Sequence, residues 1–172
     1  MVAPSKPLVG DKGGDKAVMG AIRGKRQLPP GKQAGMENQK WMNSAQIITK
    51  FFTDSLKDPQ KANQMLSLIA SKVQKKEVKL VQLGNTVFVI YPRPDKSAEF
   101  HSVTVEPQNL GMRIKTLSNT LKEMGFNKMY TLSITPQSEK LAQETGLPVK
   151  RVQSQMMSGN KMVPAFRYEV PL

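Results

Sequence analysis

The segment VEPQNLGMRI, residues 105–114, decides the fold. An apolar run that is typical of a strand ends at Val105, and apolar residues at helical spacing begin directly after Gly111. A strand followed by a glycine-containing turn and a helix presents backbone N–H groups at the helix N-terminus, where phosphates bind. The segment therefore predicts either a phosphate-binding turn or a turn that keeps this shape without a ligand.

Hydrophobic period and cap residues predict the elements on both sides of this turn. In chain order, they are a helix that begins after Asn43 or Ser44 and ends near Leu56, a helix capped by Asp58 with Pro59 as its first residue, strands over 78–83, 86–91 and 99–105, a helix over 111–123, a strand over 128–134, a short helix from Thr135 and Pro136 to Gly146, and strands near 149–155 and 165–170. The order α-α-β-β-β-α-β-α-β-β contains no internal repeat.

The burial of two of these elements follows from their apolar residues. The helix over 111–123 should stop at Gly125, and its spacing predicts an inward stripe of Ile114, Leu117, Leu121 and Met124. The strand over 128–134 is apolar enough to be a buried strand.

Composition limits the class of protein. The chain has 172 residues, which suits one ordinary domain with an appended segment, and its formal net charge of +13 favours contact with nucleic acid, anionic membrane or acidic protein. It has no cysteine and a single histidine, His101, so we expect neither a disulfide framework nor a metal site. No run approaches about 18 apolar residues and no secretory signal is visible, so we expect no membrane span and a reducing setting.

Residues 1–40 form a basic arm that is rich in glycine and proline and cannot build a core of its own. We therefore divide the chain into this arm and a domain over residues 41–172. The simplest interpretation of the arm is a solvated, disordered tail. The alternative is contact with a protein neighbour or with nucleic acid, and the expected contact residues are then Lys12, Lys16, Arg23, Lys25, Arg26, Lys32 and Trp41.

The element order and the amino-acid sequence of residues 105–152 resemble the central unit of the Gcn5-related N-acetyltransferases, the GNAT family. The resemblance covers about residues 43–170: strand, turn, long helix, a Glu-Met-Gly-Phe stretch, strand, short helix, glycine and a further strand. It implies an α+β fold with a mixed, mainly antiparallel sheet flanked by helices, preceded by the extended basic arm.

In the GNAT family the turn reads Gln or Arg, two residues, Gly, one residue, then Gly or Ala, and its amides hold the coenzyme A pyrophosphate. Gln108 and Gly111 match this pattern, but Arg113 stands where the family has a small residue. A long side chain there either blocks the phosphates or pairs with them. The expectation is that no cofactor is bound. If acetyl-CoA binding is retained, the resemblance assigns it to Val105, Gln108, Leu110, Gly111, Met112 and Arg113.

The family's later motif, an Asn at a strand end and a Tyr on the short helix as general acid, is also broken. Thr135 and Ala142 occupy these positions, and alanine cannot donate a proton. Tyr130, Glu99, Glu106 and His101 are nearby, but residues of these types on strands more often have structural roles. We therefore assign no catalytic residue and favour a protein that is not an enzyme.

The function that follows is a non-catalytic assembly protein, similar in style to the acetyltransferase-like virion proteins of short-tailed bacteriophages, internal or associated with the portal and neck. It would be made in the host cytoplasm and would pack on portal, tail or capsid proteins, with non-specific DNA contact by the arm. One alternative is an active, cytoplasmic acetyl-CoA-dependent N-acetyltransferase. Another is a nucleic-acid-binding module, although aromatic residues make up only 6% of the chain.

Overall fold

The computed structural model describes residues 42–172. The predicted arm and its contact residues lie outside the described part of the chain: Lys12, Lys16, Arg23, Lys25, Arg26, Lys32 and Trp41. Their roles, and the division into an arm and a domain at residue 41, stay predictions.

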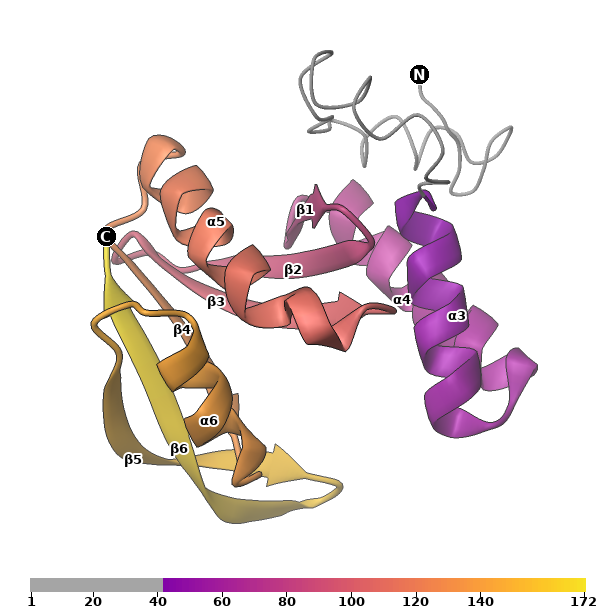
Figure 1. The fold of residues 1–172 in the computed structure, drawn as a ribbon. Helices are drawn as coiled ribbons and strands as arrows, with labels where there is room; N and C mark the ends of the chain where they lie inside the picture. Colours follow the sequence, from indigo (N-terminus) through magenta and orange to yellow (C-terminus); the bar gives the residue numbers. More distant parts are fainter. Residues whose placement is uncertain (1–41) are drawn as a thin grey trace. The chain divides into compact units, whose positions relative to one another are not determined.

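Within residues 42–172 the chain forms four α-helices, one short 3-10 helix and six strands (Figure 1). Their bounds are α3 Ser44–Leu56, α4 Pro59–Gln74, β1 Lys79–Leu83, β2 Thr86–Pro92, β3 Ser97–Thr104, the short 3-10 helix η1 Pro107–Asn109, α5 Leu110–Glu123, β4 Lys128–Ser133, α6 Gln137–Glu144, β5 Lys150–Ser158 and β6 Lys161–Pro171. The predicted element order is confirmed.

The strands form one sheet in the order β1-β2-β3-β4-β6-β5. Three neighbouring pairs, β1 with β2, β4 with β6 and β5 with β6, are antiparallel, whereas β3 and β4 are parallel. Between β3 and β4 the chain crosses over through α5, as a parallel connection requires. The predicted α+β class, with a mixed and mainly antiparallel sheet flanked by helices, is therefore confirmed.

Local cap chemistry explains where the first two helices begin. The Asn43 side chain accepts a hydrogen bond from the Gln46 backbone N–H, and the Gln46 side chain accepts one from the Asn43 N–H, which makes a capping box. The Asp58 side chain accepts from the backbone N–H groups of Gln60 and Lys61, and Pro59 occupies the first helical position. These cap positions agree with the sequence-based predictions.

The helices α4 and α5 both end at a residue with positive φ, and the N–H of the next residue bonds back to a carbonyl of the last turn. At the end of α5, Gly125 has φ +98°, and the Phe126 N–H bonds to the Leu121 carbonyl. At the end of α4 the equivalent position is Lys76, with φ 62°, and the Glu77 N–H bonds to the Lys72 carbonyl. Gly125 is thus confirmed as the stop signal, and Lys76 holds the same left-handed conformation without being glycine.

The chain packs as two compact units. The described part of the first runs from residue 42 to Ile90 and includes Ser102–Pro107, and the second comprises Tyr91–His101 and Gln108–Leu172. Buried apolar residues of the first include Ile47, Ile48, Ala62, Ile69, Val81, Val87, Phe88 and Ile90. Those of the second include Ala98, Phe100, Ile114, Leu117, Leu121, Met129, Tyr168 and Val170.

Burial differs from the predictions at the end of α5 and along β4. Met124 was expected in the inward stripe of α5, but it is the C-cap residue and its side chain is 39% exposed. The strand over 128–134 was expected to be buried, but Met129 is its only buried residue, β4 ends at Ser133, and Ile134 is 55% exposed. Met124 and Ile134 both lie just past the last residue that the regular element positions, so hydrophobic character alone overestimated their burial.

The last two strands are longer than predicted. Their pairing runs from Lys150 opposite Glu169 to Ser158 opposite Lys161, across a tight turn in which Gly159 has φ +65°. Pro164 interrupts the strand pattern of the sequence. It is accommodated because this part of β6 pairs with β5 but lies beyond its registered pairing with β4, which begins at Phe166.

Candidate functional site

The turn between β3 and α5 lies at the open N-terminus of a helix. After η1 the cap residue of α5 is Asn109, whose side chain makes no cap hydrogen bond, and the first turn of the helix contains no acidic residue. The amides of Gly111 and Met112 belong to the group that finds no acceptor within an α-helix, whereas the Leu110 N–H follows directly on the i→i+3 bonding of η1. Together with the helix dipole, this arrangement suits an anion.

Gly111 permits a close approach between two helices of the second unit. It is buried, and a Cβ atom built on it would lie 3.2 Å from Cβ of Glu144, the last residue of α6. Such a distance is shorter than ordinary van der Waals contact, so a side chain at 111 would push the end of α6 away. Gly111 therefore has a packing role in addition to any role toward a phosphate.

The residues that the resemblance assigned to acetyl-CoA occupy one short stretch of chain. Gln108 and Met112 are exposed, and Val105, Leu110 and Arg113 are half-buried. Arg113 is the fourth residue of α5, so its backbone N–H is the first that can donate a hydrogen bond to a carbonyl of the helix. Only the guanidinium of Arg113 can therefore contribute to an anion site.

The parallel pairing of β3 and β4 is short. Its register covers Ser97 with Lys128, Ala98 with Met129 and Glu99 with Tyr130. Both strands continue past this point, and β4 remains paired with β6 as far as Ser133. The registered pairing of β3 with β4 therefore ends at Glu99, close to the side chains described next.

A polar cluster forms where this pairing ends. Glu99 and His101 are two residues apart on β3, so their side chains lie on the same face, and Nε2 of His101 is 3.3 Å from Oε2 of Glu99. Nη2 of Arg93 donates to the other Glu99 oxygen, and Nε of Arg93 lies 3.3 Å from the Tyr130 hydroxyl. The ring of Tyr91 contacts the His101 ring edge to face, with 5.5 Å between centroids.

These contacts keep Glu99 ionised. The hydrogen bond from His101 and, after it, the one from Arg93 lower the pKa of the Glu99 carboxyl below its usual range, although burial opposes them. The same contact with Glu99, followed by that with Tyr130, raises the pKa of Arg93. Since the Glu99 side chain is only 11% exposed, its negative charge is held by fixed partners rather than by water.

Tyr130 has a structural environment, as expected for it. The Arg167 guanidinium lies over its ring, 4.8 Å from the centroid, and Arg167 also forms an ion pair with Glu169. Glu106, in the first unit, accepts a hydrogen bond from the Asn85 N–H at 3.3 Å, and its own N–H donates to the Thr104 hydroxyl. Glu106 thus holds a turn.

The structure also lacks the second family motif, the Asn at a strand end and the Tyr on the short helix. Ala142 lies half-buried on α6, so its position offers no side chain that can donate a proton. Thr135 lies at the junction of β4 and α6, where its hydroxyl hydrogen-bonds with those of Ser133 and Ser138. This hydroxyl cluster connects the end of the strand to the start of the helix.

Sequence reasoning identified Glu99 and His101 separately but missed Arg93 and Tyr91. The separation of two residues on a predicted strand was the available signal for Glu99 and His101. Arg93 lies across the turn 93–97 from Glu99, and nothing in the pattern indicated that contact. Within residues 42–172 there is no group of side chains suited to a metal ion, and no helix that could span a membrane.

Solved structures show what this architecture resembles. A Vibrio cholerae structure assigned as a ribosomal-protein-serine acetyltransferase matches with a TM-score of 0.55 and 11% identity over 67% of this chain and 76% of its own. The microcin C7 self-immunity acetyltransferase in complex with acetyl-CoA and AMP gives 0.54 and 11%, over 84% and 89%. A GNAT superfamily phosphinothricin acetyltransferase from Sinorhizobium meliloti in complex with acetyl-CoA gives 0.51 and 12%, over 77% and 86%.

This chain has the GNAT fold. The resemblance stated from residues 43–170 is thereby confirmed at the level of the fold. No family model matches the sequence, and no curated protein matches it either. The similarity to phage virion proteins finds no support in these comparisons.

The expectation that no cofactor is involved is corrected by the same comparisons. Two of the structures with this fold hold acetyl-CoA. The expectation rested on Arg113, which replaces the small residue of the family pattern. Since a guanidinium can pair with a phosphate, the presence of Arg113 is no reason to reject the cofactor.

Proposed function

We propose that this protein is an acetyl-CoA-dependent N-acetyltransferase, which transfers an acetyl group from the thioester to an amine. The observation that carries the proposal is the pairing of Glu99 with His101 where the β3–β4 register ends, in a fold whose long helix begins with an uncapped N-terminus. The GNAT fold supports it, because solved members of this architecture hold the cofactor.

The residues at the start of α5 fit the cofactor. The N–H groups of Gly111 and Met112 would donate hydrogen bonds to the pyrophosphate, with Leu110 and the exposed Gln108 beside them and the Arg113 guanidinium as a cation. No carboxylate in the first turn opposes such an anion. When bound, acetyl-CoA supplies the thioester whose carbonyl carbon is attacked.

His101 is the base in this proposal. Its Nε2 donates to the ionised Glu99, which leaves Nδ1 without a proton and able to accept one. As the amine nitrogen bonds to the acetyl carbon and the carbon–sulfur bond breaks, Nδ1 takes the proton that the nitrogen loses. Glu99 fixes the tautomer and stabilises the charged imidazolium, and Arg93 with Tyr130 holds Glu99 in place.

No side chain at position 142 protonates the departing sulfur. With alanine at this position, the departing thiolate would have to take its proton from solvent. This step is slower than one assisted by a positioned acid, since general acid catalysis contributes about 10²–10⁴-fold. We thus expect a modest turnover, and the substitution Ala142→Tyr should increase it.

The test is release of free thiol from acetyl-CoA in the presence of a panel of primary amines. We expect amine-dependent release that rises with pH, and a fall of kcat/KM by about 10²-fold or more for His101→Ala. Glu106→Gln, at a carboxylate that serves a turn, is the matched control and should retain activity. Amine-independent rates in the wild type would refute the proposed function, and an unchanged His101→Ala variant would refute the role of His101 as the base.

A further inference from the structure

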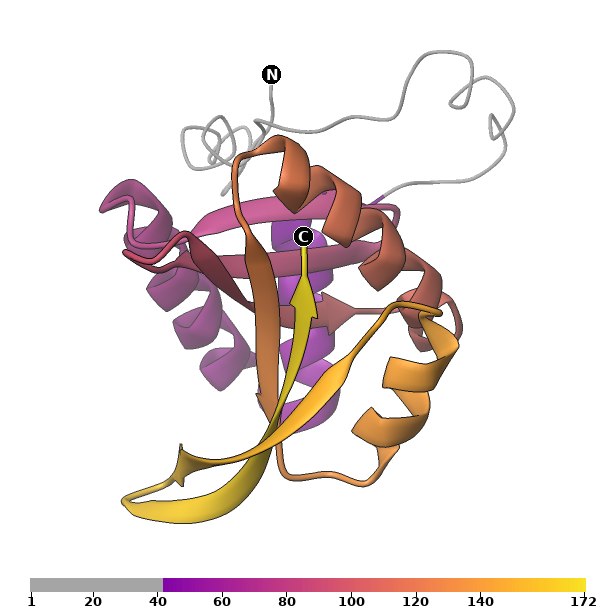
Figure 2. The same ribbon diagram turned by 90° about the vertical axis from the view of Figure 1, so that its left-hand side faces the viewer.

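A row of polar side chains in the second unit shares one face of the sheet. Glu99 and Tyr130 are register partners on β3 and β4. Tyr130 and Glu169 are register partners on β4 and β6, which run side by side (Figure 2). Register partners point to the same face, as do residues two apart on one strand. His101 and Arg167 are each two residues away from the carboxylate of their own strand, so the proposed base shares this face with an arginine.

The guanidinium of Arg167 is held in place on this face. It lies over the Tyr130 ring, 4.8 Å from the ring centroid, and its Nη2 forms an ion pair with Oε2 of Glu169. Stacking on an aromatic ring and pairing with a carboxylate both restrict a group that stands on a flexible stem. Because the ring belongs to β4, the cation of β6 leans toward β3.

The N–H groups of Arg167 are open to a ligand. Its side chain is 38% exposed, whereas that of Glu169 is 13% exposed. Within residues 42–172, Oε2 of Glu169 accepts no hydrogen bond, so the ion pair holds the guanidinium by charge and not through an aligned N–H group. A guanidinium has five N–H donors, and its planar fork matches the oxygens of a carboxylate or a phosphate. Among the described residues, no hydrogen bond uses these donors.

We propose that Arg167 binds an anionic group of the acceptor, so that the substrates are amines which also carry a carboxylate or a phosphate. The inference rests on the proposed function, which brings the attacking amine to Nδ1 of His101. Neighbouring strands lie about 4.8 Å apart, and His101 and Arg167 stand two strands apart. Since the guanidinium leans over Tyr130 on the strand between them, the gap suits a small molecule with several bonds between amine and anion.

Charge on this face favours an anion over a second cation. Both carboxylates of the row already have cationic partners. Glu99 contacts Arg93 and His101. Glu169 contacts Arg167. The second ammonium group of a diamine would therefore meet Arg167 without a carboxylate left to receive it, which is unfavourable. The formal net charge of +13 likewise attracts anionic molecules to the chain.

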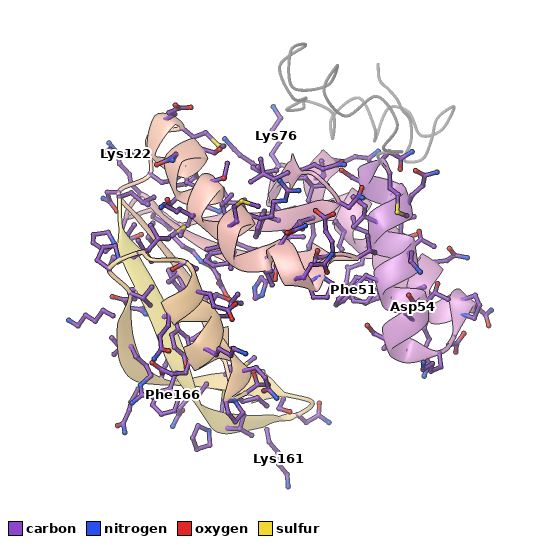
Figure 3. The ribbon with its side chains drawn as sticks, viewed as in Figure 1. Phe51, Asp54, Lys76, Lys122, Lys161 and Phe166 are labelled. Atoms are coloured by element: carbon purple, nitrogen blue, oxygen red, sulfur yellow. The ribbon has the colours of Figure 1, made fainter. Side chains whose placement is uncertain are left out.

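Arg151 offers a matched comparison on the other face. It is the register partner of Tyr168, which is the neighbour of Arg167 on β6 and so points the opposite way. Its guanidinium lies 4.6 Å from the ring centroid of Phe166, a residue of β6 that is labelled in Figure 3. It also pairs with Glu139 of α6 at 3.0 Å. Arg151 thus makes the same two kinds of contact as Arg167, but away from the proposed base.

Thiol release from acetyl-CoA with matched pairs of amines tests the inference. We expect kcat/KM to be about tenfold or more higher for ε-aminocaproate than for hexylamine, mainly through a lower KM, because the ion pair adds binding energy. The pair of O-phosphoethanolamine and ethylamine shows whether a phosphate is preferred instead. Arg167→Gln should abolish the preference, and Arg167→Lys should keep part of it, because lysine retains the charge without the fork. Arg151→Gln should leave the preference unchanged.

A double variant guards against misfolding. Arg167→Gln leaves the carboxylate of Glu169 without its partner, whereas Arg167→Gln with Glu169→Gln removes both charges and should also lose the preference. Circular dichroism reports that each variant is folded. Release with hexylamine but no preference for either charged amine would overturn the inference and leave the proposed function standing, as would a preference that survives in the double variant. No release with any amine would refute both.

Discussion

Lysine occupies backbone positions that usually favour glycine. The three non-glycine residues with positive φ among residues 42–172 are Lys57, Lys76 and Lys96. A side chain in this conformation brings Cβ close to the following carbonyl oxygen, which costs about 1–2 kcal/mol. The cost is accepted at Lys76 because the residue ends α4 through the same hydrogen bonds that Gly125 makes at the end of α5.

Replacing this lysine by glycine should therefore stabilise the protein. We expect Lys76→Gly to raise the free energy of unfolding by about 0.5–1 kcal/mol, since glycine adopts the left-handed conformation at no steric cost. The neighbouring Lys75 has φ −80° and is the matched control. Lys75→Gly should instead lower the free energy of unfolding. Urea denaturation of both variants measures the difference, and equal effects would contradict the backbone explanation.

Glu99 should make stability depend on pH. The folded-state pKa of Glu99 lies below the reference value of 4.5, so the unfolded state binds more protons in acid. Its stabilising contribution is complete above pH 4.5 and is lost as the pH falls through the lowered folded-state pKa. Glu99→Gln should cost about 1–2 kcal/mol at neutral pH, because the partner Arg93 is partly exposed and screened.

The quantity to measure against pH is the difference in unfolding free energy between the wild type and Glu99→Gln. The difference in unfolding free energy should be largest at neutral pH and shrink in acid below pH 4.5. Glu123→Gln, at an exposed position of α5, is the control and should show no such difference. A difference between wild type and Glu99→Gln that stays constant through the acid range would contradict the ion-pair interpretation.

At the scale of elements, the sequence predicts best the helix boundaries, which are set by residues within or next to the same helix. The caps Asn43 and Asp58 and the stop at Gly125 act on their own helix, so they could be identified without knowing the fold. The full length of the β5–β6 hairpin could not be predicted from local pattern, because a proline such as Pro164 disfavours a strand. Only the pairing in the structure shows that Pro164 lies beyond the registered pairing of β6 with β4.

In the candidate site, too, the residues that follow one another along the chain could be predicted, and those brought together by the fold could not. The turn at Gln108–Arg113 was predicted, because strand, glycine and helix follow one another along the chain. The cluster of Arg93, Glu99 and His101 was not, because it depends on the conformation of the 93–97 turn and on strand register. The packing role of Gly111 against Glu144 also depends on a tertiary contact that spacing does not reveal.

The contact between α5 and α6 predicts the effect of a side chain at position 111. Gly111→Val should lower the free energy of unfolding by about 1–3 kcal/mol, because the new Cβ meets Glu144 and the helices must separate. Asn119→Val, at an exposed position of the same helix, should cost less than about 1 kcal/mol. Thermal denaturation compares them, and a Gly111→Val variant as stable as wild type would contradict the close approach of the helices.

At the scale of the whole molecule, one fold combines an anion-accepting helix N-terminus and a base supported by an ionised carboxylate. Both lie in the second compact unit, which contains Tyr91–His101 and Gln108–Leu172.

Isothermal titration of the full chain with acetyl-CoA is the most direct test of this view of the molecule. We expect one molecule bound per chain with a micromolar dissociation constant, and weaker binding to Arg113→Ala because a guanidinium partner of the pyrophosphate is lost. Tighter binding to Arg113→Gly than to wild type would reverse the role given to Arg113 alone. No binding to the folded wild type, up to millimolar acetyl-CoA, would contradict the proposed function itself.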